Sequence, residues 1–143
     1  MINRRLILLA IISGVLVGLI YEIFLGHRHD YTGHYAAGFG ATYGVFMVVF
    51  RSLDSGRYTL LAPRLLIPIC LVCVAAGAVA EATVFRIARF DEVDFCNQSL
   101  GAVLATACAS GHAASLRLAD GDYDYGLVVG IGFLGLGGVF AVA

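Results

Sequence analysis

Long apolar runs separated by short polar stretches dominate the hydrophobic pattern of this chain. The runs occupy residues 6–25, 35–50, 65–85, 100–116 and 125–143. A helix needs about 20 predominantly apolar residues to cross the hydrocarbon core of a bilayer. Strands of transmembrane barrels instead alternate in polarity over about ten residues. The pattern therefore predicts an all-α integral membrane bundle of about five transmembrane helices, and the chain length predicts a single domain over residues 1–143.

Proline and glycine positions add detail to these expected helices. Pro63 opens the third run, and Pro68 is expected in the first turn of the helix, where proline costs little. The fourth run is short and rich in Ala and Ser, and the fifth is glycine-rich. Glycines four residues apart allow helices to approach closely, and we expect them to serve packing inside the bundle rather than dimerisation. Such pairs are Gly14 with Gly18, Gly40 with Gly44, and Gly126 with Gly130.

The overall composition supports the membrane interpretation and narrows the classes of partner. Hydrophobic residues make up 60% of the chain and charged residues only 13%, whereas about a quarter of a soluble domain is charged. The bilayer is therefore the expected partner. A net charge of -1 and the lack of a basic run predict no binding to nucleic acid. Cys70, Cys73 and Cys108 lie inside apolar runs, so we expect no disulfide framework.

Arginines flank the apolar runs unevenly and predict the orientation of the chain. The first run is too long for the hydrophobic region of an ordinary signal peptide and ends near Glu22, so we interpret it as an uncleaved helix. With the N-terminus in the cytoplasm, more arginines lie inside than outside, as the positive-inside rule requires. The inner arginines are then Arg4, Arg5, Arg51, Arg57, Arg64 and Arg117, and the outer ones are Arg28, Arg86 and Arg89.

In this orientation, two polar stretches lie at the outer ends of helices, over residues 27–35 and 81–98. Ionisable groups at such depths usually face the interior of a bundle and pair with each other. Asp30 and His34 are four residues apart, so they share a face of a helix that begins near Asp30. Such a pair could act as a general base, as part of a metal site or as a structural hydrogen bond.

Metal binding and catalysis stay open as alternatives for these stretches. His27, His29 and His34 are possible metal ligands by residue type, but their spacing matches no sharp metal signature, so we predict no cofactor. No serine or cysteine lies in a recognisable nucleophile motif, which favours a binding role over catalysis. A third acidic stretch, residues 120–124, has aspartates at alternate positions but lacks the remaining ligands of a calcium loop, and we expect a solvated turn there.

Two sets of residues in these stretches follow the order of a known family. Asp30, His34 and Tyr35 form an Asp-x-x-x-His-aromatic motif that opens the second predicted helix. Further along come Glu81, Arg89 (or Arg86), Asp94 and, seven residues later, Gly101. In this order and placement, residues 6–116 resemble the VanZ-like family of small multi-helix membrane proteins, named for a member associated with teicoplanin resistance. The chain departs from the family pattern at Tyr31 (usually Lys), Val84 (usually Gln) and Gln98 (usually Asn).

The resemblance implies a multi-pass protein of the bacterial inner membrane whose polar motifs gather at the outer face. The implied site comprises Asp30, His34, Glu81, Arg89, Asp94 and Gln98. Its expected role is to bind or act on a cell-wall precursor or lipid head group, with a link to glycopeptide antibiotic tolerance. Two alternatives remain: a non-catalytic subunit or assembly factor of a larger membrane complex, with other subunits or further copies of the chain as partners, and a metal-dependent membrane enzyme.

Overall fold

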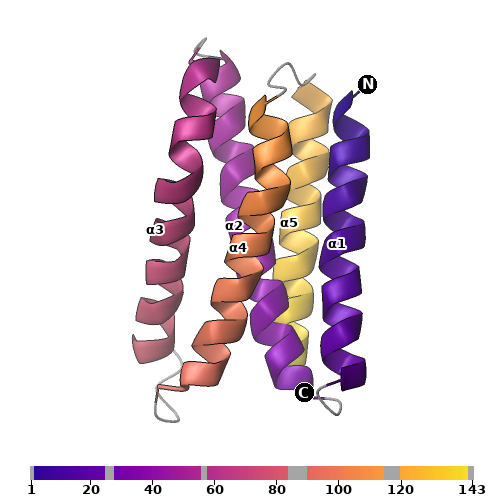
Figure 1. Ribbon diagram of the computed structural model, residues 1–143, viewed down its shortest axis with the longest axis vertical. Coiled ribbons are helices and arrows are strands. Elements are labelled where there is room, and N and C mark those ends of the chain that lie inside the picture. Colours follow the sequence, from indigo (N-terminus) through magenta and orange to yellow (C-terminus); the bar gives the residue numbers. More distant parts are fainter. Residues whose placement is uncertain (1, 25–27, 56–57, 84–89, 115–119, 142–143) are drawn as a thin grey trace.

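The computed structural model describes residues 2–24, 28–55, 58–83, 90–114 and 120–141, and within these ranges the chain is helical and contains no strand. The helices are α1 (Ile2–Phe24), α2 (His29–Ser55), α3 (Ala62–Thr83), α4 (Glu92–Ala114) and α5 (Asp120–Ala141), with a short 3-10 helix, η1 (Thr59–Leu61), before α3. They stand side by side as one bundle (Figure 1). The predicted all-α bundle is confirmed.

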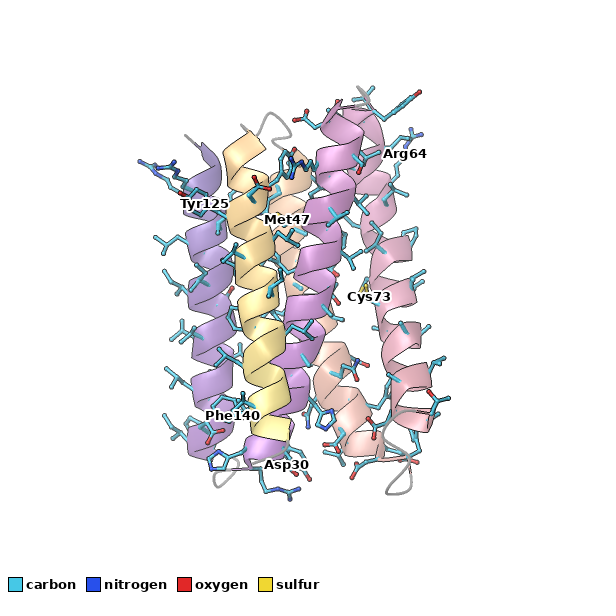
Figure 2. The ribbon with its side chains drawn as sticks, turned by 180° about the vertical axis from the view of Figure 1, so that it is seen from behind. Asp30, Met47, Arg64, Cys73, Tyr125 and Phe140 are labelled. Atoms are coloured by element: carbon cyan, nitrogen blue, oxygen red, sulfur yellow. The ribbon has the colours of Figure 1, made fainter. Side chains whose placement is uncertain are left out.

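Successive helices run in opposite directions, so the two termini lie at opposite ends of the bundle (Figure 1). One end holds the starts of α2 and α4 and the ends of α1, α3 and α5. We call it the His34 end, and we call the other the Asp124 end. The two polar stretches of the sequence therefore meet at the same end, because both flank helices that begin or finish there. Figure 2 shows Asp30 and Phe140 at this end, and Arg64 and Tyr125 towards the other.

Four segments of the described chain are long and apolar enough to cross a membrane. They are Arg4–Phe24, His29–Asp54, Thr59–Thr83 and Tyr123–Phe140. The glycine-rich fifth run thus qualifies, whereas α4 is not among the four. α4 is rich in small and polar side chains and contributes seven buried residues to the bundle. Its polar side chains Asn97 and His112 are buried, which explains how a helix of modest hydropathy occupies this position.

Each helix begins before the apolar run that predicted it, and this changes the place of two sequence features. α3 begins at Ala62, so Pro68 lies inside the helix rather than in its first turn. There the ring removes one backbone hydrogen bond, which transmembrane helices tolerate when neighbouring groups compensate. The second feature is the acidic stretch. α5 begins at Asp120, so residues 120–124 open a helix instead of forming a turn. Negative charge in that position suits the helix dipole.

α2 is the central helix and carries most of the packed interior. Its largest buried side chains are aromatic and follow one another along the helix: Tyr35, Phe39, Tyr43, Phe46 and Phe50. The Phe39 and Tyr43 rings stack at 5.8 Å between centroids, and Phe39 also contacts the Phe133 ring of α5 at 4.7 Å. Such ring contacts add to the stability supplied by burial alone.

Glycines bring α2 and α5 into backbone contact. A side chain at Gly130 would lie 2.9 Å from the carbonyl oxygen of Gly40 and the backbone of Gly44. A side chain at Gly137 would meet the backbone of Ala37 in the same way. Small residues promote helix association because they let backbones approach. Gly14, Gly40, Gly126 and Gly130 therefore serve internal packing as predicted, whereas Gly18 is open, with the Thr32 Cγ2 atom as its nearest neighbour at 4.0 Å.

The cysteines lie within this helical framework as free thiols. Cys70, Cys73 and Cys108 are half-buried and Cys96 is exposed. The Ser13 hydroxyl of α1 lies 3.3 Å from the Cys108 sulfur of α4, so this thiol takes part in helix packing.

Candidate functional site

An imidazole and a carboxylate face each other at the His34 end of the bundle. The His34 Nε2 atom of α2 lies 3.4 Å from the Asp94 Oδ2 atom of α4. Both side chains are largely enclosed, with 16% and 17% of their surface exposed. Pairing with a carboxylate fixes the orientation of an imidazole ring. The sequence had predicted a carboxylate partner for His34, and the ion pair in the structure is with Asp94.

Two glycines explain why His34 and Asp94 meet. A side chain at Gly38 would collide with the backbone of Gln98, and one at Gly101 would collide with the backbone of Tyr35. Gly38 lies one turn after His34 on the same face of α2. Gln98 lies one turn after Asp94 on α4. The close backbone approach at Gly38 therefore holds the preceding turns together and brings the imidazole to the carboxylate.

The local start of α4 also depends on sequence signals near the site. The Asp91 Oδ1 atom accepts hydrogen bonds from the backbone N–H groups of Val93, at 2.8 Å, and Asp94, at 3.3 Å. An aspartate in this position satisfies donors that the first turn leaves without helical partners. Asp91 therefore acts as the N-cap of α4 and fixes the turn that carries Asp94.

Glu81 joins this cluster from the last turn of α3. The Gln98 side chain packs against Gly77, where even a methyl group would collide with the amide. Glu81 lies one turn further along the same face of α3, and only 7% of it is exposed. Its Oε2 atom is buried and has no hydrogen-bond partner among the described residues. The structure thus brings Glu81 and Gln98 to the region that holds His34 and Asp94.

Asn97 belongs to the same group and is hydrogen-bonded to Tyr21, and the sequence did not single out either as a site residue. The Tyr21 hydroxyl of α1 donates to the Asn97 Oδ1 atom at 2.9 Å, and the Tyr21 ring stacks on Tyr35 at 5.4 Å. Asn97 is buried. Its position beside Gln98 in a polar stretch was a usable signal. Tyr21 gave none, because an aromatic residue near a helix end is common in membrane proteins.

Three polar atoms of this cluster are buried without a hydrogen-bond partner in the described structure. They are Glu81 Oε2, Asp94 Oδ1 and Asn97 Nδ2. Most buried polar groups in proteins are satisfied, and each exception requires an explanation. Two of the three atoms are carboxylate oxygens, which accept hydrogen bonds, and the third is an amide nitrogen, which donates. The cluster therefore favours a ligand that is rich in hydrogen-bond donors.

Burial and nearby charges both affect the pKa of the Asp94 carboxyl group. Asp94 lies outside the four span-length segments. Burial raises the pKa of its carboxyl group above the ordinary value of 3.8; nearby His34 lowers it, and the charges of Asp91 and Asp30 raise it further. Desolvation disfavours the charged form of a carboxyl group. A donor from a ligand at Asp94 Oδ1 would stabilise that charged form.

The remaining predicted site residues lie around this cluster or outside the described chain. The Asp30 carboxylate is held by Arg28 through two hydrogen bonds, of 3.0 and 2.6 Å, and both groups are exposed. His29 pairs with Glu22 at 3.0 Å, and its ring stacks on Phe140. Arg89, Arg86 and His27 fall outside the described residues.

The arrangement of the histidines bears on the metal alternative. His34 faces Asp94 and His29 faces Glu22, so the structure engages these two candidate ligands with different carboxylates. Across the described ranges, no three His, Cys, Asp or Glu side chains are grouped closely enough to hold a metal ion. A metal centre therefore finds no support in this part of the chain.

Comparisons with known proteins add no family to this description. No family model, no curated protein and no solved structure matches the chain. The fold and the cluster define a class all the same: an all-α bundle with helices of membrane-spanning length and an enclosed polar cluster at one end. We call this group the polar cluster (His34, Glu81, Asp94, Asn97 and Gln98).

Proposed function

We propose that the protein binds the polar head group of a lipid, or of a lipid-linked envelope precursor, at the polar cluster. The observation that carries the proposal is the set of buried atoms without partners, Glu81 Oε2, Asp94 Oδ1 and Asn97 Nδ2. Leaving such atoms unsatisfied destabilises a fold. A ligand that supplies hydroxyl or ammonium donors would satisfy the two carboxylate oxygens, and its acceptors would satisfy the amide.

The position of the cluster supports a ligand of the membrane. Two of its residues, His34 and Glu81, lie near the ends of α2 and α3, which are long and apolar enough to cross a bilayer. The end of a membrane-spanning helix lies at the depth of the lipid head groups. In our proposal, polar side chains at this depth are kept for recognition, because ionisable residues in membrane segments are usually functional.

The resemblance to the VanZ-like family supports the envelope as the place of action. We propose that the N-terminus lies in the cytoplasm of a bacterial cell, as the arginine distribution predicts. The polar cluster would then face the outer leaflet of the inner membrane, where cell-wall precursors are used. Loss of head-group binding would lower tolerance to glycopeptide antibiotics that target those precursors.

Binding to purified protein tests the proposal. The unfolding midpoint in mixed micelles is measured as a glycosyl diacylglycerol, phosphatidylethanolamine or the parent diacylglycerol is added. We expect stabilisation by one of the first two lipids and little by the third; the first would identify hydroxyl donors and the second ammonium donors.

Glu81→Gln removes one charged acceptor and should weaken binding by about tenfold or more. Glu92→Gln removes an exposed carboxylate at the same end of the bundle and serves as the control. Equal stabilisation by all three lipids would contradict the proposal.

A cellular experiment tests the envelope role separately. Variants Asp30→Asn, His34→Ala and Glu81→Gln are expressed singly in cells that lack the gene, and glycopeptide tolerance is measured. We expect His34→Ala and Glu81→Gln to fail, because both lie in the polar cluster, and Asp30→Asn to have a smaller effect, because Asp30 is engaged by Arg28. Wild-type tolerance with all three variants would contradict a role in the envelope.

A role as a subunit of a larger membrane complex is the second candidate. α3 favours it, because its buried residues are only Ala62, Gly77 and Glu81 and large side chains such as Ile67, 71% exposed, cover the rest of the helix. Native mass spectrometry from mild detergent distinguishes the two. A stable heteromeric complex that binds through α3 would support the subunit role, and an isolated monomer or homodimer would argue against it.

A further inference from the structure

A cavity of about 150 Å³ lies between α1, α2 and α5, near the His34 end. Its lining is mostly apolar and includes Gly14, Gly18, Thr32, Tyr35, Phe133 and Phe140. None of the three unpartnered atoms of the polar cluster belongs to a residue of this lining. The cavity is therefore a separate feature, and a ligand bound in it is independent of the proposed head-group site.

Glycines of α1 create the space. At Gly18 the nearest atom to an added Cβ is the Thr32 Cγ2 atom of α2, at 4.0 Å, so the surface of α1 is open here. One turn deeper, an added Cβ at Gly14 would lie 2.6 Å from the Phe133 ring. The ring of α5 thus closes the inner part of the cavity, and the missing side chain of Gly18 leaves the part nearer the His34 end open.

The surface of the cavity is largely apolar, and two polar residues, Glu22 and Thr32, belong to its lining towards the His34 end. Glu22 lines it near the His34 end and pairs with His29, whose ring stacks on Phe140 at 6.0 Å. Thr32 also lines it; this residue is only 6% exposed, and its Oγ1 atom has no hydrogen-bond partner in the described structure. Gly14 lies eight residues before Glu22 on α1, which places the apolar depth about 12 Å from the polar end.

We propose that this cavity holds part of an ester-linked acyl chain of a membrane lipid. Its volume matches that of an apolar cavity of about 150 Å³ that holds a benzene-sized molecule in another protein. The space therefore accommodates several carbons of a chain. The Thr32 hydroxyl donates to the ester carbonyl, and the lipid head group lies beside Glu22 and His29. The order of polar and apolar groups along the cavity is that of a lipid along the membrane normal.

Photo-crosslinking tests the occupant directly. The full chain is reconstituted in vesicles of phosphatidylethanolamine and phosphatidylglycerol that contain a phospholipid with a diazirine on one acyl chain. After illumination, the labelled positions are mapped by mass spectrometry. We expect the label to concentrate on residues 14–22 and 133–140. Label distributed in proportion to exposure, with the α3 side chains Ile67, Leu71 and Val72 as the main sites, would overturn the proposal. Chain-to-chain crosslinks at the cavity would overturn it too.

Substitution at Gly18 sharpens the test. Gly18→Leu fills the cavity without a collision at Cβ and should remove most of the labelling of residues 133–140, because the added side chain occupies the space of the acyl chain. The control is Gly132→Leu, since no atom lies within 4 Å of that position; it should leave the labelling unchanged. Thr32→Val keeps the shape, removes the hydroxyl and should weaken labelling by a smaller factor. Unchanged labelling in folded Gly18→Leu protein would contradict the proposal.

Discussion

The two faces of α2 are built from opposite chemistry. Towards α5, Gly40 and Gly44 bring the backbones together, and Phe39 packs on Phe133. Towards α3 and α4, the His34 end of α2 meets a cluster in which buried polar atoms lack partners. The first face contributes stability through close packing. The second retains polar groups that lower stability, which is typical of sites selected for function.

Buried polar groups along α2 and its neighbours are of two kinds. Tyr43 and His112 form a fully buried hydrogen bond of 2.9 Å between α2 and α4, further along α2 than the polar cluster. Here the Tyr43 hydroxyl and the His112 Nε2 atom satisfy each other. Glu81, by contrast, is buried with a free carboxylate oxygen. The two sites should therefore respond in opposite ways when a polar group is removed.

The largest effect is expected at the α2–α5 face. Gly40→Val places a side chain against the backbone of Gly130 and Leu134, and neither can move without displacing α5. Overpacking of this kind should lower the free energy of unfolding by about 3 kcal/mol, measured by titration with a denaturing detergent. Gly132→Val on the open side of α5 is the control. Equal losses in the two variants would show that α2 and α5 do not rely on the glycine contact.

A smaller loss is expected where polar groups satisfy each other. Tyr43→Phe removes the hydroxyl from the His112 Nε2 atom and should lower the free energy of unfolding by about 1–3 kcal/mol. Tyr58→Phe removes an exposed hydroxyl and should have little effect. The same detergent titration measures both. A neutral Tyr43→Phe would mean that the bond with His112 does not stabilise the bundle.

In the polar cluster, removal of a polar group is expected to raise the free energy of unfolding instead of lowering it. Glu81→Met replaces a buried carboxylate with an apolar side chain of similar length and should raise the free energy of unfolding by about 1 kcal/mol. The same variant should lose head-group binding. Unfolding and lipid titrations on one preparation test both effects. A clear loss of stability would indicate that Glu81 has a structural role, and the contrast between the two faces would then fail.

The smallest expected effect is the contribution of Asp94 to the pH dependence of stability. Because burial raises the pKa of its carboxyl group, the folded state binds the proton more tightly than the unfolded state. The resulting stability is present below the ordinary pKa of 3.8 and is lost as the pH rises through the folded value. Asp94→Asn should therefore gain stability relative to the wild type as the pH rises above 3.8. Glu92→Gln is the control, and a parallel dependence in all three proteins would contradict the assignment to Asp94.

The sequence predicted the bundle because long apolar runs specify helices almost by themselves. It located the helix bounds less well, since the polar ends of α2 and α4 extend beyond the runs at 35–50 and 100–116. The fourth run was predicted as a span, yet α4 is not among the four segments that are long and apolar enough to cross a membrane, because its small and polar residues lower its hydropathy. The burial of Asn97 and His112 against neighbouring helices depends on three-dimensional packing and leaves no local signal.

The polar cluster was predictable in its members but less so in its pairings. His34, Glu81, Asp94 and Gln98 stood out as polar residues at helix ends. The partner of His34 depends on the contact between Gly38 and Gln98, which spacing along one helix cannot reveal. Asp30 shares a helix face with His34, but a neighbouring arginine binds its carboxylate. The contact between α2 and α4 at Gly38 and Gly101 was therefore the missing information.

Infrared difference spectroscopy of the carboxyl groups tests most directly whether the polar cluster receives a ligand. Spectra of wild-type protein and of Glu81→Gln are recorded before and after addition of the lipid that stabilises the wild type. We predict that lipid shifts a carboxyl or carboxylate band in the wild type, and that this band is missing from the difference spectrum of the variant. Identical difference spectra for the two proteins would contradict the central claim that the buried carboxylate of Glu81 is kept for binding.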